Sequence, residues 1–364
     1  MLDPERTMPS IQGNPLKKDL DFILSRTKNQ WEELRGCHIF ITGGTGFFGN
    51  WLLESFVWAN DHLDLKATAF VLTRDLESYK GKAPHLANHP SINFVEGDIL
   101  SFDFPHGEFQ YLIHAATETA HDLYDKDPLL AFEVIVSGTR HILEFARKAK
   151  VTKLLFTSSG AVYGYQPPHM MHIQEDYQGA PSLSDPNIVY GEGKRVAELL
   201  CSLYARKYGF EAKIARCFAF VGPYMPLDQH VAIGNFIRDA LQGGPIQVQG
   251  DGTPFRSYLY AADLAIWLWT ILFRGKSCRP YNVGSDAAIQ IKDVAISVAR
   301  ELPGGSEVVV KGVTDVSSPA QRYVPDVNRA RQELGLSVEI PLSVGVRRTM
   351  RWNSGMSLDP FIKE

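Results

Sequence analysis

Two side chains that could move a proton stand four residues apart, Tyr190 and Lys194 in the run YGEGK. At this spacing both would lie on one face of a helix. An ammonium group beside a phenol lowers the pKa of the phenol, so Tyr190 could act as a general base near neutral pH. A Tyr/Lys pair at this spacing is also common on protein surfaces, and its meaning depends on the residues upstream.

A hydroxyl-rich run, TSSGAVYG, follows the apolar segment 153–157. If that segment is a strand, Thr157 and Ser159 lie at the carboxyl edge of a sheet, where open α/β sheets bind ligands. Ser159 could then hydrogen-bond a reacting oxygen while Tyr190 takes its proton. The alternative is a serine that caps the next turn, and the Tyr/Lys pair argues against it.

A glycine-rich run, ITGGTGFFG, places glycines at positions 43, 46 and 49 between an apolar segment and a helical one. In such a loop Gly43 permits the tight turn, Gly46 lets the backbone approach a pyrophosphate, and Gly49 packs the helix on the sheet. Phe47 and Phe48 open the helix, whose N-terminal N–H groups and dipole favour phosphates. The run predicts a dinucleotide cofactor.

The next strand end carries both signs of charge, as Arg74 and Asp75. An acidic residue there would bond the ribose hydroxyls of NAD, and a basic residue would favour the 2′-phosphate of NADP. We expect NAD, with NADP as the alternative. Asp98 could bond the adenine or cap a loop. The remaining cofactor contacts expected at strand ends are Ile99, Ala115, Ala116 and Thr157.

Alternating apolar segments must position these residues. Strand-like runs at 37–42, 67–73, 93–95, 111–114 and 153–157 alternate with helical runs at 51–60, 128–148 and 190–208. This alternation predicts an α/β fold, a Rossmann-like doubly wound parallel sheet with a smaller C-terminal substrate-binding lobe. We expect an N-terminal helical extension (1–36), an NAD(P)-binding domain (37–216, with a return segment near 255–285) and a substrate-binding lobe (217–254 and 286–350).

The composition is that of an ordinary globular protein, with 364 residues, 45% of them hydrophobic, and a net charge of −4. Interspersed charges predict no nucleic-acid partner. The apolar runs are too short for a membrane span, and the N-terminus lacks an export signal, so we expect a cytoplasmic protein without a membrane partner. The four scattered cysteines are expected to be buried, reduced thiols, and no metal site is expected.

In this order, the glycine loop, the strand-end serine followed by V-Y-G, and Y-x-x-x-K resemble the extended short-chain dehydrogenase/reductase superfamily. Within it the chain is similar to the NAD-dependent epimerase/dehydratase family of nucleotide-sugar enzymes, from about Cys37 to Arg348. The resemblance implies that Ser159, Tyr190 and Lys194 are catalytic and that the substrate is a nucleotide-diphosphate sugar. It also implies a homodimer, formed through the central helix and the Tyr/Lys helix. The substrate contacts that it implies are Glu118, Thr119, His230, Asn235 and Arg256, where His230 is alternatively a surface histidine.

Two features depart from the family pattern. The 4,6-dehydratases carry acidic residues directly after the active hydroxyl residue, where this chain has Gly160 and Ala161. This argues against a standard 4,6-dehydratase or UDP-glucuronate decarboxylase. Ile135 and Ala219 stand where the family commonly has asparagine, so the grip on the nucleotide must differ.

We therefore expect an NAD(P)-dependent nucleotide-sugar epimerase that oxidises its substrate transiently to a keto-sugar. The alternatives are an NADPH-dependent keto-sugar reductase, which Arg74 favours, and an atypical 4,6-dehydratase. A non-catalytic dinucleotide sensor is a further alternative, but it would have no chemical need for Ser159, Tyr190 and Lys194 together.

Overall fold

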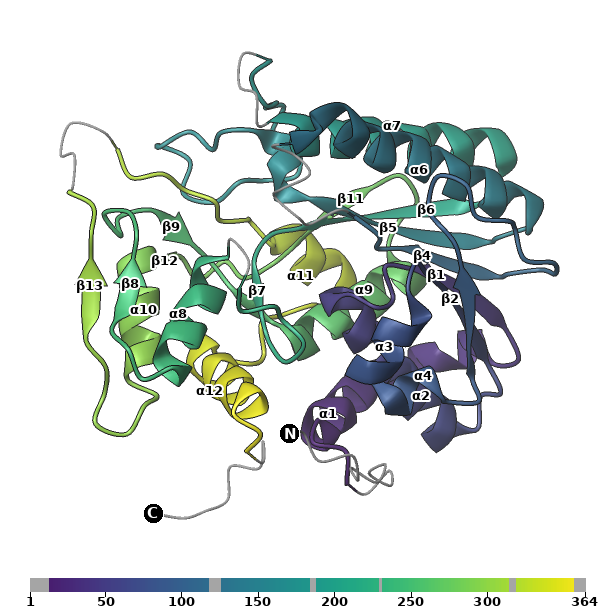
Figure 1. The fold of residues 1–364 in the computed structure, drawn as a ribbon. Helices are drawn as coiled ribbons and strands as arrows, with labels where there is room; N and C mark the ends of the chain where they lie inside the picture. Colours follow the sequence, from purple (N-terminus) through teal and green to yellow (C-terminus); the bar gives the residue numbers. More distant parts are fainter. Residues whose placement is uncertain (1–12, 118–125, 184–187, 229–230, 314–318, 357–364) are drawn as a thin grey trace.

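The computed structural model describes residues 13–117, 126–183, 188–228, 231–313 and 319–356. Figure 1 shows a β-sheet with helices on both of its faces, and a smaller lobe beside it. Among the described helices, none is long and apolar enough to cross a membrane.

Seven parallel strands form the central sheet, in the order β11-β6-β5-β4-β1-β2-β3. The sheet is extended in opposite directions from the neighbouring strands β1 and β4, so this pair marks the switch point at which doubly wound sheets bind ligands. The expected doubly wound parallel sheet is confirmed. The strands are β1 His38–Thr42, β2 Thr68–Thr73, β3 Ile92–Glu96, β4 Tyr111–His114, β5 Lys153–Ser159, β6 Glu211–Cys217 and β11 Pro280–Val283.

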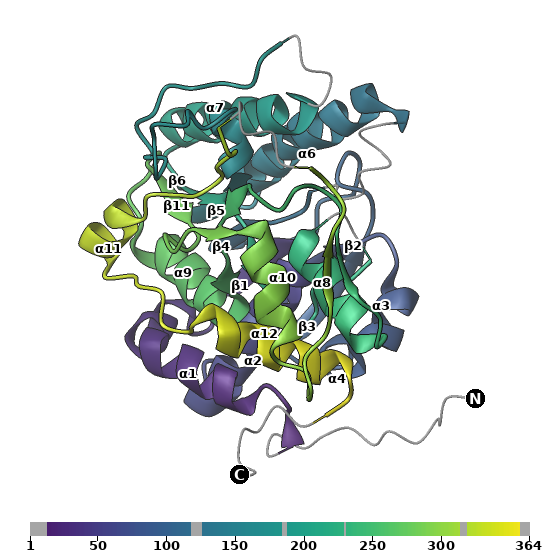
Figure 2. The same cartoon turned by 90° about the vertical axis from the view of Figure 1, so that its left-hand side faces the viewer.

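Two helical layers cover the sheet because side chains alternate between the faces of each strand. In β1, Ile39 and Ile41 join one apolar core, and Phe40 joins the other. Figures 1 and 2 show the two layers on opposite sides of the sheet. One layer holds α1 Lys17–Thr27, α2 Phe47–Leu63, α3 Leu76–Lys82, α4 Pro84–Ala87 and α9 Ala261–Arg274, and the other holds α6 Pro128–Lys148 and α7 Val189–Tyr208.

Local sequence sets the ends of these helices. Asp127 caps α6, because its side chain accepts a hydrogen bond of 3.0 Å from the Leu130 N–H, and Pro128 follows in the first turn. Helix α7 ends at Gly209, which has a φ of +83°. The apolar spacing predicts a helix over 51–60, but helix α2 already begins at Phe47. The Gly46 carbonyl accepts the first hydrogen bond of the helix, from the Asn50 N–H.

The N-terminal segment is built into the core beneath the sheet. Helix α1 and the 3-10 helix η2 (Lys28–Leu34) bury Trp31, whose ring centroid lies 4.6 Å from that of Trp269 in α9. The buried Asp19 carboxylate accepts a hydrogen bond of 2.7 Å from Tyr260 and pairs with Arg348. These contacts join the first helix to the last helices of the chain.

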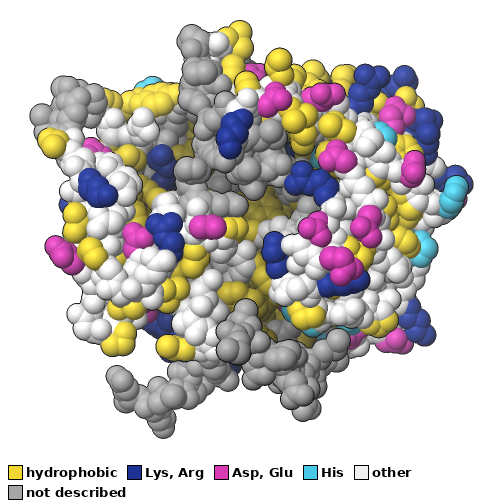
Figure 3. Space-filling view, viewed as in Figure 1, with side chains coloured by type: hydrophobic (Ala, Val, Ile, Leu, Met, Phe, Trp, Pro, Cys, Tyr) yellow, Lys and Arg dark blue, Asp and Glu magenta, His cyan; other side chains and the backbone are white. Residues whose placement is uncertain are grey.

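The smaller lobe is made of short strands and three helices in its described part. Strand β8 pairs with β13, β9 with β12, and β7 with β10. The molecular surface is hollowed between this lobe and the sheet domain, and acidic and basic side chains are interspersed around the hollow (Figure 3). The elements are β7 Phe220–Val221, α8 Ala232–Leu241, β8 Ile246–Val248, β9 Phe255–Arg256, β10 Leu259–Tyr260, β12 Ile289–Gln290, α10 Ile291–Ala299, β13 Val308–Val310 and α12 Leu342–Asn353, while α11 Asn328–Leu334 lies against β11.

The four cysteines are free thiols, as expected, but they differ in burial. Cys201 and Cys217 are buried in helix α7 and strand β6. Cys37 and Cys278 are only half-buried, and for these two the prediction of burial was wrong. Both precede a strand of the sheet at its amino end, where the core no longer covers the chain.

Candidate active site

The glycine loop joins β1 to α2 at the switch point of the sheet. Gly43 has a φ of +71°, and a Cβ atom there would lie 2.6 Å from the backbone of Ala115 and Ala116. At Gly49 it would lie 2.2 Å from the carbonyl oxygen of Gly43. Both positions therefore require glycine for packing within the protein.

Gly46 differs, because a Cβ atom there would meet only the Gly43 carbonyl oxygen, at 3.4 Å. No side chain caps the N-terminus of α2, which begins directly after Gly46. The Phe48 ring packs against Phe220, with 5.0 Å between the ring centroids. The polar groups at this end of the helix are therefore its backbone N–H groups. A glycine free of internal crowding beside an uncapped helix N-terminus fits the pyrophosphate of a dinucleotide.

The charges after β2 and β3 have distinct local roles. The Asp75 side chain caps α3 by accepting a hydrogen bond of 2.8 Å from the Ser78 N–H, and the exposed Arg74 stands beside it. The Asp98 side chain accepts a hydrogen bond of 2.9 Å from the Leu100 N–H, which is the loop-cap alternative. Ile99 is buried against Gly138 of α6. Asp98 thus stabilises its own turn at the edge of the sheet.

His114 fixes the strand end that faces the glycine loop. Its ring bonds Thr42 through Nδ1 (2.8 Å) and Thr139 through Nε2 (3.0 Å). Burial, followed by the charge of Lys194, lowers the pKa of His114 to about 3, so the ring is neutral. The Thr42 hydroxyl also accepts a hydrogen bond of 3.1 Å from the Ala116 N–H. This network holds Ala115 and Ala116 against Gly43.

Ser159, Tyr190 and Lys194 come together at the carboxyl edge of β5. The buried Lys194 ammonium donates a hydrogen bond of 3.0 Å to the Thr157 carbonyl and lies 5.8 Å from the centroid of the Tyr190 ring. The Ser159 hydroxyl accepts a hydrogen bond of 3.1 Å from the Ala161 N–H. The turn-capping alternative for Ser159 is therefore present together with the Tyr/Lys pair.

Burial changes the titration expected for this pair. It raises the pKa of Tyr190 to about 12, and the neighbouring Ser159 side chain only partly opposes this shift. It lowers the pKa of Lys194 to about 8. The sequence-based prediction of a lowered phenol pKa is thus wrong for the protein alone, because both groups lose their hydration and the ammonium is turned to the Thr157 carbonyl.

A buried ion pair behind the site was missed by sequence reasoning. Glu198 of α7 accepts hydrogen bonds from Ser158 (2.5 Å) and from Arg216 of β6 (2.7 and 3.0 Å). The Arg216 guanidinium also lies 4.8 Å from the centroid of the Tyr163 ring. Glu198 stands four residues after Lys194, so its spacing could have placed it on the same face of the helix. This network anchors α7 to the strand that carries Ser159.

On the side of the smaller lobe, one arginine stands on strand β9 and a second on the segment that bridges to it. Arg256 of β9 donates a hydrogen bond of 2.9 Å to the Phe255 carbonyl. Arg322, which sequence reasoning missed, bridges to Phe255 and lays its guanidinium over that ring at 4.1 Å. Its Nη1 atom is buried and has no hydrogen-bond partner within the described part of the chain. A buried guanidinium nitrogen without a hydrogen-bond partner is suited to an anionic ligand.

Among the other predicted substrate contacts, Asn235 lies on α8 and accepts a hydrogen bond of 3.2 Å from Arg238. Glu118, Thr119 and His230 fall outside the described residues.

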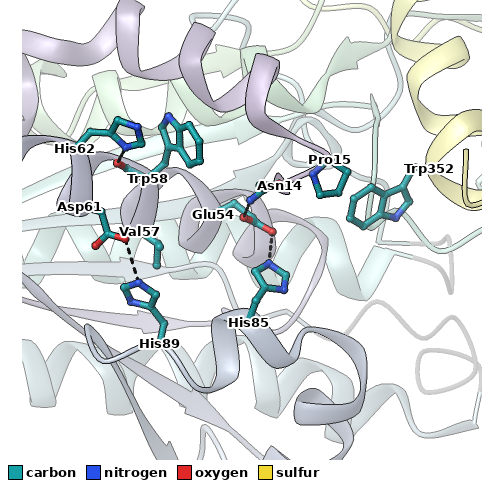
Figure 4. A pocket seen from close by; sticks show the side chains of 10 residues that line it. All are labelled: Asn14, Pro15, Glu54, Val57, Trp58, Asp61, His62, His85, His89 and Trp352. Atoms are coloured by element: carbon teal, nitrogen blue, oxygen red, sulfur yellow. Dashed lines mark hydrogen bonds and ion pairs between the residues drawn. The ribbon is translucent and has the colours of Figure 1, made fainter. Parts of the chain in front are cut away.

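A cavity of about 180 Å³ lies away from this site and is lined mainly by α2, the segment around α4 and the residues just before α1 (Figure 4). The buried Glu54 accepts hydrogen bonds from His85 (2.7 Å), Tyr224 (2.5 Å) and Asn14 (3.1 Å). These bonds satisfy the carboxylate and tie four segments together. Within the described residues, no group of three or more acidic, histidine or cysteine side chains could hold a metal ion.

Comparison with known proteins gives consistent results. The model of a family described as the NAD dependent epimerase/dehydratase family matches residues 39–284. The chain is 27% identical over 314 residues to UDP-glucuronic acid decarboxylase 1 of Xenopus tropicalis, covering 86% of this chain and 71% of that protein. It is 29% identical over 309 residues to UDP-glucuronic acid decarboxylase 6 of Arabidopsis thaliana, covering 85% and 86%.

Solved structures show the same fold. A UDP-glucose 4-epimerase of Thermotoga maritima, with UDP-glucose, superposes with a TM-score of 0.72 at 20% identity, covering 87% of this chain and 99% of that one. A UDP-glucuronic acid 4-epimerase of Bacillus cereus, in complex with UDP-glucuronic acid and NAD, superposes with a TM-score of 0.73 at 22% identity and covers the same shares.

Proposed function

Because the chain belongs to the NAD dependent epimerase/dehydratase family, we propose that it is a nucleotide-sugar epimerase that oxidises its substrate transiently to a keto-sugar. The observation that carries this proposal is the meeting of Ser159, Tyr190 and Lys194 at the sheet edge, with Gly160 in place of an acidic residue directly after Ser159. Oxidation and reduction need these three groups, whereas elimination of water needs a further acid.

In this function Tyr190 takes the proton of a sugar hydroxyl and later returns it, and Ser159 hydrogen-bonds the same oxygen. Lys194, held by the Thr157 carbonyl, orients the ribose of the cofactor and supplies positive charge near Tyr190. Bound NAD supplies the hydride acceptor and donor. The phosphates of that cofactor would lie at Gly46 and the start of α2, with Ala115, Ala116 and Ile99 along its length.

The pair Arg256 and Arg322 supports a nucleotide-diphosphate substrate. Arg256 lies on β9 and Arg322 on the segment that bridges to it, and the buried Nη1 atom of Arg322, which has no partner among the described residues, needs an acceptor. Diphosphate oxygens are such acceptors, and one planar guanidinium group can donate to two of these oxygens at once. The solved relatives with UDP-glucose and UDP-glucuronic acid support the same substrate class.

A second candidate is decarboxylation of UDP-glucuronic acid, which the names of the curated relatives favour. It also starts from oxidation to a keto-sugar, but the carbon that loses carbon dioxide must then be protonated by an acid. Gly160 and Ala161 offer no such group. A reductase that consumes NADPH is favoured only by Arg74, whose neighbour Asp75 is engaged as a helix cap.

The helices α6 and α7 support a homodimer as part of this proposal. Their outer faces expose large apolar side chains, which on a soluble protein mark an interaction surface. The side chains are Leu129, Leu130, Phe132, Leu199 and Leu203.

The first test is to denature the purified protein and identify the dinucleotide it releases. Near-stoichiometric NAD is expected, since a cycle that returns its hydride does not exchange the cofactor. An empty site that prefers NADPH would favour the reductase instead.

The second test is turnover of UDP-glucose, UDP-glucuronic acid and dTDP-glucose. We expect an epimerised product without release of carbon dioxide or water, and Tyr190→Phe should lose at least about 100-fold in rate while retaining NAD. Release of carbon dioxide from UDP-glucuronic acid would instead establish the decarboxylase. The absence of any turnover would favour the non-catalytic dinucleotide sensor.

A further inference from the structure

The helix turn that carries Tyr190 has little support from its own sequence. Ile188, the residue at the N-cap position of α7, has an apolar side chain and cannot accept a hydrogen bond from the first turn. Gly191 and Gly193 follow directly, and each glycine weakens a helix by about 1 kcal/mol relative to alanine. The position of the Tyr190 phenol must therefore be set by contacts with other parts of the chain.

Better helix formers do not fit at the two glycine positions. A Cβ atom at Gly191 would lie 2.8 Å from the Ala161 carbonyl oxygen, and one at Gly193 would lie 3.1 Å from the Ile135 side chain. This close packing sets how near the helix lies to its neighbours. Its position along the neighbouring strand depends on directional bonds.

Two such bonds join α7 to β5, one helical turn apart. The Lys194 ammonium donates a hydrogen bond of 3.0 Å to the Thr157 carbonyl, and the Ser158 hydroxyl donates one of 2.5 Å to the Glu198 carboxylate. Lys194 and Glu198 share one face of the helix. Thr157 and Ser158 are successive residues of the strand that ends at Ser159. Together the two bonds fix both the height and the rotation of the helix relative to the end of the strand.

Arg216 makes the second of these bonds rigid. It stands beside Ser158 in the register of β6 on β5, and its Nε and Nη2 atoms donate to the two oxygens of Glu198 at 3.0 and 2.7 Å. Its Nη1 atom donates to the Glu175 carbonyl at 3.1 Å, and its guanidinium lies 4.8 Å from the centroid of the Tyr163 ring. A shielded, two-pronged ion pair of this kind holds the carboxylate in one orientation.

We propose that Glu198 is a positioning residue that fixes the Tyr190 phenol relative to Ser159. Through Ser158 and Arg216 it holds α7 at one position along β5, so it acts through the helix and not by contact with the substrate. The role rests on the proposed function, in which Tyr190 and Ser159 must reach the same sugar oxygen. A displacement of about 1 Å can cost a reacting pair about 100-fold in rate.

The first test is the steady-state kinetics of Glu198→Gln, with whichever of UDP-glucose, UDP-glucuronic acid and dTDP-glucose the original protein turns over. Glutamine keeps the shape of the side chain and an oxygen for Ser158, but it removes the charge that pairs with Arg216. Rates are divided by the amount of NAD-loaded protein, so that misfolded protein does not lower kcat. We expect kcat to fall at least about tenfold and KM to stay within about twofold, because the binding groups are unchanged.

Ser158→Ala removes the tie to β5 and keeps the ion pair, so it tests the proposal even if Glu198→Gln does not fold. It should lower kcat by about threefold to tenfold, again with KM unchanged. Combined with Glu198→Gln, it should add less than its own effect, because both changes disturb one network.

Tyr204→Phe is the matched control on the same helix. Its hydroxyl donates to Glu144 of α6 at 2.6 Å, further along α7 than Glu198. Loss of this bond should lower thermal stability and leave kcat and KM unchanged. The control therefore separates the loss of a position from the loss of stability.

Amide hydrogen exchange of the NAD-saturated protein gives a readout that needs no substrate. In Glu198→Gln and Ser158→Ala, the backbone of residues 190–197 should exchange at least about tenfold faster than in the original protein. In Tyr204→Phe, exchange of the same residues should be unchanged.

If a nucleotide sugar is turned over, unchanged kcat in both Glu198→Gln and Ser158→Ala would overturn the proposal. An equal fall of kcat in Tyr204→Phe, or a rise in KM at constant kcat, would also overturn it. If no nucleotide sugar is turned over, the proposed function fails and hydrogen exchange decides. Faster exchange in the two site variants alone would then uphold the role of Glu198, and unchanged exchange would refute it.

Discussion

Lys194 carries a charge that the surrounding protein disfavours. It is almost fully buried, and burial lowers its pKa from the ordinary lysine value of 10.5 to about 8. Its partner is a neutral carbonyl, so the cost of burying the ammonium is only partly offset. Glu198, four residues further along the helix, is engaged by Arg216 and Ser158. The site therefore keeps a poorly compensated cation near its reactive phenol.

This burial predicts that Lys194→Met stabilises the cofactor-free protein at neutral pH, by up to about 3 kcal/mol, while it abolishes turnover. A group with a depressed basic pKa costs stability while it is charged in the folded state. The cost is relieved as the pH rises from about 8 toward 10.5.

Unfolding by urea at pH 7 and pH 9.5 measures the effect. The original protein should gain stability over this range relative to the variant. Equal pH dependence of the two proteins would contradict the prediction.

The glycines of the β1–α2 unit differ in what surrounds them. Two are required by packing within the protein, and we expect the third to be required by a ligand. Gly43 and Gly49 lie against backbone atoms, whereas Gly46 does not meet any atom closer than 3.4 Å. The open position coincides with the uncapped start of α2. We therefore expect the same unit to serve packing at its ends and phosphate binding in its middle.

A matched pair of variants tests this division. Gly46→Ala should cost at most about 1 kcal/mol of folding free energy, and it should weaken NAD binding at least about tenfold because the methyl group enters the phosphate site. Gly49→Ala should cost more than about 2 kcal/mol, since the backbone must move.

Thermal unfolding without cofactor and calorimetric titration with NAD separate the two effects. Unchanged NAD affinity in Gly46→Ala would show that the phosphates lie elsewhere.

At the scale of the whole molecule, exposed apolar side chains gather on α6 and α7, the two helices that cover one face of the sheet. Leu199 and Leu203 are 58% and 50% exposed, although Ala197, Cys201 and Ala205 of the same helix are buried in the core. They stand four residues apart and extend one stripe on the helix. Exposed leucines in such a stripe are expected to be covered by a second copy of the chain.

Leu199→Glu combined with Leu203→Glu should therefore convert a dimer to a monomer, because like charges would be buried without partners. Light scattering gives the mass directly. Val313→Glu is the control, since Val313 is 93% exposed in the smaller lobe and should not change the mass. A monomeric mass for the original protein would refute the dimer.

The sequence by itself determined five of the seven strands of the sheet and the positions of Ser159, Tyr190 and Lys194 on their elements. Helix α6 has the predicted bounds, Pro128 to Lys148, and the strand before Ser159 was predicted to within two residues. Period and spacing are local properties, so the glycine loop and the Tyr/Lys pair could be placed on their elements without knowledge of the packing.

Only the tertiary structure decided how these groups titrate and what surrounds them. Burial, which no local pattern reports, reverses the expected shift of the Tyr190 pKa. Arg322 reaches the site from a segment distant in sequence, through its bridge to Phe255 of β9. The physical reason is that desolvation and close contact depend on every element packed around a group, whereas a motif records only its neighbours along the chain.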